Sequence, residues 1–232
     1  MVAFGLVHGA WHGAWCWSRL TPLLQARGHH VVAVDLPCEV VGAGSVRYAQ
    51  VVVDALAGVN EDVVLVGHSL GGATIPVVAA HRPVRRLVYL CAALRDPGTS
   101  MTDQITNGPD GDMASTPAMT GIEYGDDGLS WMSDDAAATW FLYQDCDPET
   151  AGWAVRKLRR QWNFWGEVAP IDKLPDAEPV SILGTEDRVM NPAWSRRASR
   201  EKLGVDAIEL PGGHSPFLSR PAELAEVLCR DL

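Results

Sequence analysis

Short apolar runs alternate along the chain with longer stretches of mixed polarity. The apolar runs are typical of buried strands and lie at residues 2–7, 30–34, 62–66, 86–91, 179–183 and 205–210. The stretches between them predict helices near residues 15–27, 46–58, 70–82, 191–203 and 217–230. Pro37, Pro83 and Pro211 fall at the expected ends of elements. This alternation predicts an α/β fold, with about six mainly parallel strands and helices on both faces of the sheet.

One long stretch, residues 94–170, breaks this alternation, and we call it the cap segment. Its first part, residues 95–128, is rich in Asp, Gly, Thr, Pro and Met and shows little periodicity. Two helices are predicted further on, at residues 134–142 and 147–158, and Asp147-Pro148 would begin the second. A long run without predicted structure in a compact domain usually has a function of its own. We therefore expect a core of residues 1–93 and 171–232, with the cap segment folded over its site.

A G-x-S-x-G pattern, Gly67-His68-Ser69-Leu70-Gly71, joins the third predicted strand to the following helix. A strand that turns sharply into a helix strains the central serine and leaves room only for glycine two residues away on each side. The turn exposes the Ser69 hydroxyl above the sheet and points the N–H of Leu70 at any oxyanion formed there. The pattern predicts the nucleophile of a serine hydrolase. The alternative is a glycine-rich turn without catalytic chemistry.

Candidates for an acid and a base follow Ser69 in the order that such hydrolases use. Asp187 comes shortly after the fifth predicted strand, and His214 comes after the sixth. Parallel sheets assemble their sites at these carboxyl ends. His214 would accept the proton of Ser69, and Asp187 would hold the imidazole in the correct tautomer. Glu186 is the alternative acid, but a position a few residues past the strand favours Asp187.

The loop after the first strand reads His8-Gly9-Ala10-Trp11. An H-G turn at this place supplies a second N–H to the oxyanion, here that of Ala10. We expect His8 to brace the loop and not to take part in catalysis. Most of the nine tryptophans are expected in the core. Trp11 and Trp131 are candidates for the pocket wall, because each adjoins a segment expected to face the site.

Five segments spread over nearly the whole chain carry recognisable motifs. They are residues 8–17 (HGAWHGAWCW), 35–37 (DLP), 67–72 (GHSLGG), 184–187 (GTED) and 212–214 (GGH). Together they resemble the methyl esterase and hydroxynitrile lyase family of α/β-hydrolases. The resemblance implies a cofactor-free enzyme that acts on a small ester or a cyanohydrin. It also implies the nucleophile Ser69, the acid Asp187, the base His214 and the oxyanion N–H groups of Ala10 and Leu70.

Two positions separate the esterases of this family from its lyases. The lyases resemble one another in a threonine after the first-loop histidine and a lysine after the catalytic histidine, where the lysine stabilises departing cyanide. Here Gly9 and Ser215 stand at these positions, so we favour an esterase. A lyase or cyclase that uses the same residues is the second hypothesis. A ligand-binding protein built on a hydrolase scaffold is the third.

Composition narrows the possible partners and surroundings. A length of 232 residues is that of one domain, and a net charge of −10 argues against nucleic acid or an anionic membrane as a partner. The start carries no Lys or Arg before Arg19, so no secretory signal is predicted. Five cysteines without a C-x-x-C pair suit reduced thiols in the cytoplasm better than disulfides or a zinc site. We expect a small-molecule ester as the partner and no cofactor or metal, while a homodimer stays an open alternative.

Overall fold

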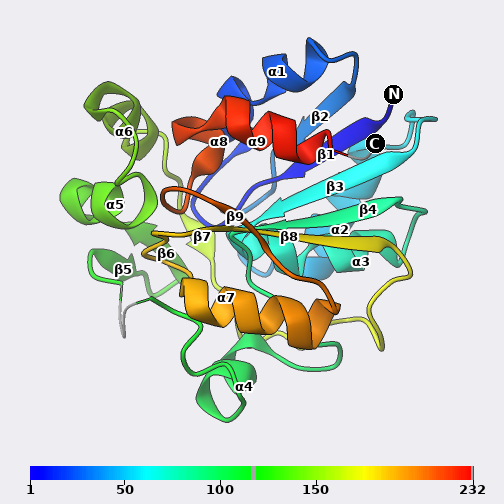
Figure 1. The fold of residues 1–232 in the computed structure, drawn as a ribbon. Helices are drawn as coiled ribbons and strands as arrows, with labels where there is room; N and C mark the ends of the chain where they lie inside the picture. The colour runs from blue at the N-terminus through cyan, green and yellow to red at the C-terminus, as the bar shows by residue number, and fades with distance from the viewer. Residues whose placement is uncertain (116–118, 231) are drawn as a thin grey trace.

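A six-stranded parallel sheet runs through the centre of the molecule (Figure 1). The computed structural model describes residues 1–115, 119–230 and 232. In spatial order the strands are β2 (His30–Val34), β1 (Ala3–Val7), β3 (Val63–His68), β4 (Arg86–Leu90), β8 (Glu178–Gly184) and β9 (Ile208–Leu210). All neighbouring pairs in this sheet are parallel. The predicted fold class is confirmed, although the last strand is shorter than the apolar run that predicted it.

Helices cover both faces of the sheet. One face carries η1 (Ala14–Arg19), α1 (Thr21–Gln25), α8 (Pro216–Ser219) and α9 (Pro221–Leu228), and the other carries α2 (Ser45–Ala55), α3 (Ile75–Ala79) and α7 (Pro192–Ala198). Figure 1 shows α1 and α9 above the sheet, with α3 and α7 below it. In β3, Val63 and Leu65 pack toward α2 and α3, whereas Val64 and Val66 pack toward α8 and α9. Both faces are buried because successive side chains of a strand point to opposite sides.

Several predicted helices are shorter or divided. The predicted helix 217–230 is split into α8 and α9 at Pro221, because proline cannot donate the next helical hydrogen bond and restricts the residue before it. The predicted helix 70–82 begins as a 3₁₀ helix, η2 (Ser69–Ala73), before α3. A short π-helix, η3 (Ser199–Leu203), extends α7. Among the described residues, none of the helices has the length and apolarity that crossing a membrane requires.

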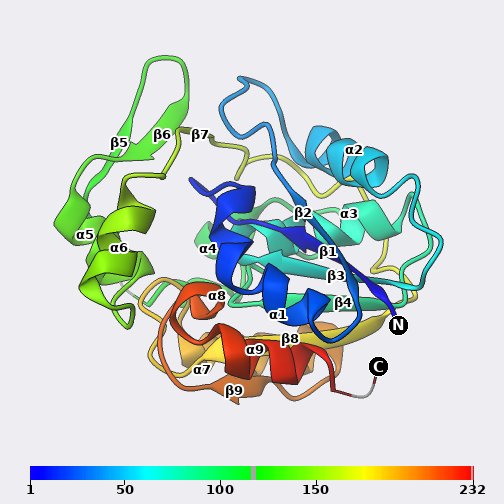
Figure 2. The same cartoon turned by 90° about the horizontal axis from the view of Figure 1, so that it is seen from above.

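The cap segment contains a small antiparallel sheet and three helices. They are β5 (Ile122–Tyr124), β6 (Leu129–Met132), β7 (Gln161–Trp162), α4 (Met101–Thr106), α5 (Asp135–Leu142) and α6 (Pro148–Val155). Figure 2 shows α5, α6 and the small sheet together on one side of the parallel sheet. The prediction that residues 95–128 lack regular structure is wrong, because α4 and β5 lie there. Both are too short to produce a readable period. The N-cap is as predicted, with Asp147 Oδ1 accepting the Thr150 N–H at 2.9 Å.

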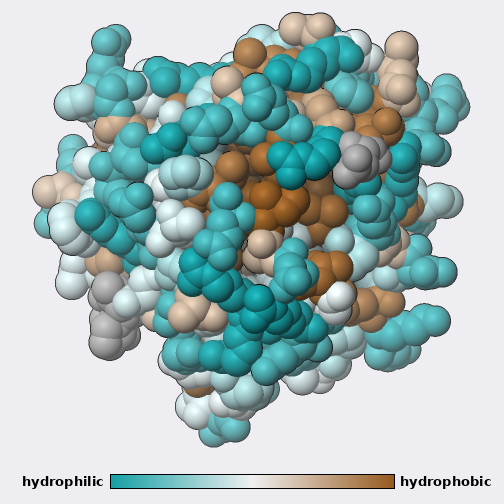
Figure 3. Space-filling model, viewed as in Figure 1, coloured by the Kyte–Doolittle hydropathy of each residue, from teal (hydrophilic) through white to brown (hydrophobic). Residues whose placement is uncertain are grey.

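The edge of the sheet at β9 is only partly covered. β9 pairs with the last three residues of β8, so among the described residues the first half of β8 has a strand only on its β4 side and is open on the other. Figure 3 shows an apolar patch near the centre of this face, in the region of β8 and β9, surrounded by polar side chains. The half-buried side chains of Val180 and Ile208 lie on these two strands. A very short edge strand limits the length of backbone open to pairing with another chain.

A buried polar network ties the cap segment to the core. The Asp110 side chain is 3% exposed, and its Oδ1 accepts a hydrogen bond from Trp194 Nε1 at 2.8 Å. Its Oδ2 accepts hydrogen bonds from Lys202 Nζ at 2.8 Å and Gln104 Nε2 at 2.7 Å. Burial disfavours the charged carboxylate, yet the hydrogen bonds from Lys202, Trp194 and Gln104 hold the pKa of Asp110 below its ordinary value. This carboxylate therefore joins the region of α4 to α7 and η3.

We predict that Asp110→Ala lowers the free energy of unfolding by about 3 kcal/mol or more, because it leaves the Lys202 and Trp194 groups buried without this partner. Urea denaturation followed by circular dichroism measures the change. The control is Asp112→Ala, which removes an exposed ion pair with Arg197 and should lower stability by less than about 1 kcal/mol. Equal losses in the two variants would contradict the prediction.

Candidate active site

Strained backbone gathers where three neighbouring central strands end. Trp11, Ser69 and Cys91 have φ angles of 61°, 50° and 45°, and they are the non-glycine residues with positive φ in the described ranges. They follow β1, β3 and β4, which are adjacent in the sheet. A non-glycine residue in this region costs of order 1–3 kcal/mol, and such residues cluster at functional sites. The carboxyl edge of the sheet is therefore the place to look for chemistry.

Ser69 sits in the tight turn that its sequence pattern predicts. A Cβ atom at Gly67 would lie 2.7 Å from the Gly71 carbonyl oxygen, and one at Gly71 would lie 2.6 Å from the Val7 carbonyl oxygen. Both positions therefore require glycine. The first loop presses on the same turn, because a Cβ atom at Gly9 would lie 2.7 Å from the Cβ of Ser69.

Asp187 and His214 form a buried pair, with His214 Nδ1 donating a hydrogen bond to Asp187 Oδ2 at 2.8 Å. The other carboxylate oxygen, Oδ1, accepts the backbone N–H groups of Val189 at 2.8 Å and Met190 at 3.0 Å. With Nδ1 protonated, Nε2 of the neutral imidazole is free to accept a proton. Glu186, the alternative acid, is exposed, so the structure brings Asp187 to the histidine.

His214 is also held from the side of Ser69. His68 Nε2 donates a hydrogen bond to the His214 carbonyl oxygen at 3.0 Å, and the two ring centroids are 4.7 Å apart. Ser69 directly follows His68, so the nucleophile candidate and the base candidate lie on contacting segments. Among the described residues, there is no hydrogen bond between Ser69 Oγ and His214. Such nucleophile–base bonds are often long in free hydrolases.

His8 braces the first loop from inside. Its Nδ1 donates a hydrogen bond to the Gly9 carbonyl oxygen at 2.8 Å, and its Nε2 accepts the Leu36 N–H at 3.0 Å. Burial lowers the pKa of His8 to about 4. The imidazole is therefore neutral near pH 7 and uses both nitrogens, as the expected structural role requires.

His12 is a second brace that the sequence did not reveal as one. Its Nδ1 donates to the Ala10 carbonyl oxygen at 2.7 Å, and its Nε2 accepts the Tyr143 hydroxyl at 2.8 Å. Burial lowers the pKa of His12 to about 3. The repeated His-Gly-Ala-Trp at residues 8–11 and 12–15 is the only sequence signal that His12 has a bracing role like that of His8. No sequence signal pointed to Tyr143 as the partner of His12. Through Tyr143, the cap segment contacts the loop that carries Ala10.

Two backbone N–H groups are available beside Ser69. Ala10 follows Gly9, which lies against Ser69, and Leu70 follows Ser69 in the first turn of η2. Neither N–H donates a hydrogen bond to another described residue, although both residues are nearly buried. Free N–H groups on facing loops can stabilise the negative oxygen of a tetrahedral intermediate.

A cavity of about 220 Å³ opens beside these loops. Its lining is mostly apolar and comes from the first loop, the cap segment and the two residues that follow Arg188. The lining residues are Ala10, Trp11, Ile105, Met113, Ala114, Met119, Ile122, Tyr124, Trp165, Val189 and Met190, with Ser130, Gln161 and Asn163 as further polar members. Trp11, a candidate for the wall, lies there and donates from Nε1 to Ser130 Oγ at 3.1 Å. The cavity also reaches Val189 and Met190, whose N–H groups hold Asp187.

Trp131, the other candidate for the wall, is not among the described residues that line the cavity. It follows Ser130 in β6, and successive side chains of a strand point to opposite faces. Ser130 faces the cavity, and Trp131 instead packs against the Arg160 guanidinium, whose Cζ is 4.4 Å from the ring centroid. The placement of Trp131 on the pocket wall is therefore corrected.

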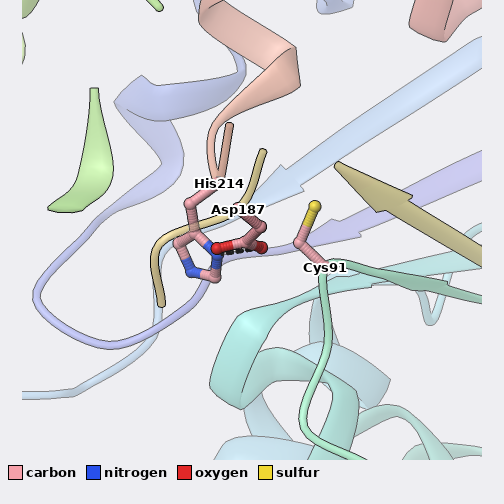
Figure 4. A group of neighbouring side chains, drawn as sticks. All are labelled: Cys91, Asp187 and His214. Atoms are coloured by element: carbon pink, nitrogen blue, oxygen red, sulfur yellow. Dashed lines mark hydrogen bonds and ion pairs between the residues drawn. The ribbon is translucent and has the colours of Figure 1, made fainter. Parts of the chain in front are cut away.

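Cys91 lies beside the acid–base pair, as Figure 4 shows. Cys91, Asp187 and His214 are residue types that bind metal ions in proteins. Each offers one possible ligand atom here, and these three atoms lie within 4.8 Å of one another. However, His214 Nδ1 carries a proton that it donates to Asp187, and burial raises the pKa of the Cys91 thiol well above its ordinary value. Metal ligation requires these groups to be deprotonated. The arrangement suits an acid–base pair better than a metal site.

The alpha/beta hydrolase family profile matches residues 6–227. The chain is 30% identical to a pyrethroid hydrolase of Sphingobium wenxiniae, over 96% of this chain and 85% of that protein. It is equally 30% identical to an alpha-hydroxynitrile lyase of Arabidopsis thaliana, over 97% of this chain and 95% of that protein. The crystal structure of a pyrethroid hydrolase from Sphingobium faniae superposes with a TM-score of 0.82 at 28% identity, covering 98% of this chain and 95% of that one.

The buried histidines predict that stability falls as the pH falls. Because the pKa values of folded His8 and His12 lie near 4 and 3, the unfolded chain binds more protons than the folded chain below about pH 6.5. Stability is thus fully present above pH 6.5 and decreases toward pH 4. We expect the free energy of unfolding to fall by about 2–4 kcal/mol between pH 7 and pH 5.5, at about 1.4 kcal/mol per unit for each histidine.

Urea denaturation at intervals across this range measures the slope, above the range where most carboxylates titrate. His12→Gln removes one titrating group and should reduce the fall by about 1 kcal/mol. A wild-type stability that is flat between pH 7 and pH 5.5 would show that these histidines are not held neutral.

Proposed function

The chain belongs to the alpha/beta hydrolase family, and on this premise we propose that it is a serine esterase that cleaves small carboxylic esters. The observation that carries the proposal is the buried Asp187–His214 hydrogen bond of 2.8 Å on segments that contact the strained turn of Ser69. This combination is what acyl transfer by a serine requires. The pyrethroid hydrolase relatives are named for hydrolysis, which agrees with this choice.

In the proposed mechanism, His214 Nε2 removes the proton of Ser69 as Ser69 Oγ attacks the ester carbonyl carbon. The carbonyl oxygen becomes an oxyanion and accepts hydrogen bonds from the N–H groups of Ala10 and Leu70. His214 then gives its proton to the departing alcohol, which leaves an acyl group on Ser69. Water, activated by the same imidazole, releases the acid. Asp187 stays ionised and stabilises the imidazolium at each step.

We propose that residues 94–170 act as a cap that shapes the substrate pocket. The cavity of about 220 Å³ takes most of its apolar wall from this segment, including Met113, Met119 and Trp165. A space of this size and polarity suits a small apolar acyl or aryl group better than a long chain or a charged one. The proposed steps need no metal ion or cofactor.

Two residues favour an esterase over a cyanohydrin lyase. Gly9 has no side chain to hold a substrate hydroxyl, and an added Cβ there would lie 2.7 Å from Ser69 Cβ and 2.9 Å from His68 Nδ1. Ser215 follows His214, is fully buried, and offers no positive charge to a departing cyanide. A ligand-binding protein without catalysis would make no use of the strained Ser69 turn.

We predict that Ser69→Ala and His214→Ala each lower kcat for ester hydrolysis by roughly 10⁴-fold or more, because the catalytic residues act as a unit. Steady-state kinetics with p-nitrophenyl acetate measure this, and circular dichroism checks that the variants fold. Asp187→Asn should lower kcat by a similar factor, whereas Glu186→Gln should change it little. If Ser69→Ala kept more than about a tenth of the activity, Ser69 would not be the nucleophile.

We also predict that small aryl or methyl esters are hydrolysed and that mandelonitrile is cleaved at most in traces. A missing positive group beside cyanide in a desolvated pocket is worth a few kcal/mol, or on the order of 10²-fold in rate. Parallel assays of p-nitrophenyl acetate, methyl esters and mandelonitrile make the comparison. Mandelonitrile turnover above that of every ester tested would favour the lyase hypothesis.

A further inference from the structure

The end of α5 and the turn that follows it contact both loops that carry the acid and the base. The acid loop, residues 185–188, contains Asp187, and the base loop, residues 211–214, contains His214. The two loops are joined directly, because the Glu186 N–H donates to the Gly212 carbonyl oxygen at 2.9 Å. From the cap segment, Trp140, Gln144 and Asp145 reach these loops, and we call these three residues the cap clamp.

Gln144 bridges the two loops. Its Nε2 donates a hydrogen bond to the Glu186 carbonyl oxygen at 2.6 Å, one residue before Asp187. Its amide group also fills the space above Gly213, where an added Cβ would lie 2.6 Å from Nε2 and 2.7 Å from Cδ. Gln144 therefore contacts the residue before the acid and the residue before the base.

Asp145 holds the base loop by its backbone. Its Oδ2 accepts the Gly213 N–H at 3.0 Å, and the same oxygen occupies the space where a Cβ at Gly212 would lie. Gly212 has a φ angle of 99°, which only glycine adopts readily. The other oxygen, Oδ1, is buried and makes no hydrogen bond with the described residues. Its carboxylate thus sits at the base loop, one residue from His214.

Trp140 holds the acid loop from the outside. The Arg188 Cζ lies 3.5 Å from the Trp140 ring centroid, and Arg188 Nη1 donates to the Trp140 carbonyl oxygen at 3.4 Å. Arg188 directly follows Asp187. The residues on both sides of the acid, Glu186 and Arg188, are therefore tied to α5 and the turn that follows it.

We propose that Gln144 and Asp145 are positioning residues for the Asp187–His214 pair, so that the cap segment sets the geometry of catalysis as well as the shape of the pocket. The inference rests on the proposed function. Neither residue touches a reacting atom in this scheme. Each fixes backbone next to the acid or the base, and a displacement of about 1 Å in such groups can lower a rate by about 10²-fold.

The test compares variants that keep or remove single hydrogen bonds. Asp145→Ala loses the acceptor for the Gly213 N–H, whereas Asp145→Asn keeps an oxygen that can accept it. We expect Asp145→Ala to lower kcat by about 10-fold or more with KM changed less than about twofold, and Asp145→Asn to restore most of the loss. Gln144→Glu keeps the shape of the side chain without the donor and should behave like Asp145→Ala.

The matched control is Asp147→Ala. Asp147 is an acid two residues further on that caps α6 and contacts neither loop. It should leave kcat and KM unchanged. If Asp145→Asn lowered kcat as far as Asp145→Ala, the charge of Asp145 and not its hydrogen bond would matter, and the proposal would be overturned. The proposal would fail equally if Asp145→Ala and Gln144→Glu matched the wild type.

Two readouts do not depend on the identity of the substrate. Amide hydrogen exchange at Gly213 should be faster in Asp145→Ala than in the wild type, by about 10-fold or more, because the N–H loses its partner. Phosphonylation of Ser69 by a fluorophosphonate should slow in Asp145→Ala and Gln144→Glu but not in Asp147→Ala. A wild-type protein that labels at Ser69 yet hydrolyses no ester would refute the esterase, while these readouts would still decide for or against the clamp.

Discussion

The close approach of the first loop to the nucleophile turn is the constraint on which the site depends. Gly9 lies so near Ser69 that one added carbon would clash, and Gly71 lies equally near the backbone of Val7. This contact brings the loop that carries Ala10 against the turn that carries Ser69 and Leu70. It is possible only because β1 and β3 are neighbours that end at the same edge of the sheet. Ser69 has a left-handed backbone conformation, which is strained for a residue other than glycine, and this packing holds it in place.

Such close packing leaves the polar side chains around it buried, and their pKa values are shifted accordingly. His8, His12 and His68 have pKa values lowered by burial, so each is a neutral group that donates through one nitrogen. A charged brace at the same positions would face a large desolvation penalty. These three histidines hold backbone segments in place, whereas the proposed mechanism uses His214 to exchange a proton. Under the proposed function, scaffolding and acid–base chemistry fall to separate imidazoles.

Local sequence was sufficient to predict where Ser69, Asp187 and His214 lie, because each follows a strand and the parallel sheet brings strand ends together. The sequence also predicted the bracing role of His8, which follows the first strand. The cap segment was harder to predict, since α4 and β5 are too short to show a period and depend on contacts with distant residues. Trp131 shows a limit of prediction from sequence. A position in a segment near the site does not determine on which face of β6 the side chain lies.

The contacts between the cap segment and the core suggest why the two parts can work as one unit. The Tyr143 hydroxyl is hydrogen-bonded to His12, next to the first loop, and the next two residues, Gln144 and Asp145, reach the acid and base loops. Three consecutive residues thus contact the first loop, the acid loop and the base loop. A cap that only covered a pocket would need no such contacts. Because changes in the cap segment would move these loops as well as the pocket wall, substrate preference and turnover should be coupled in this enzyme.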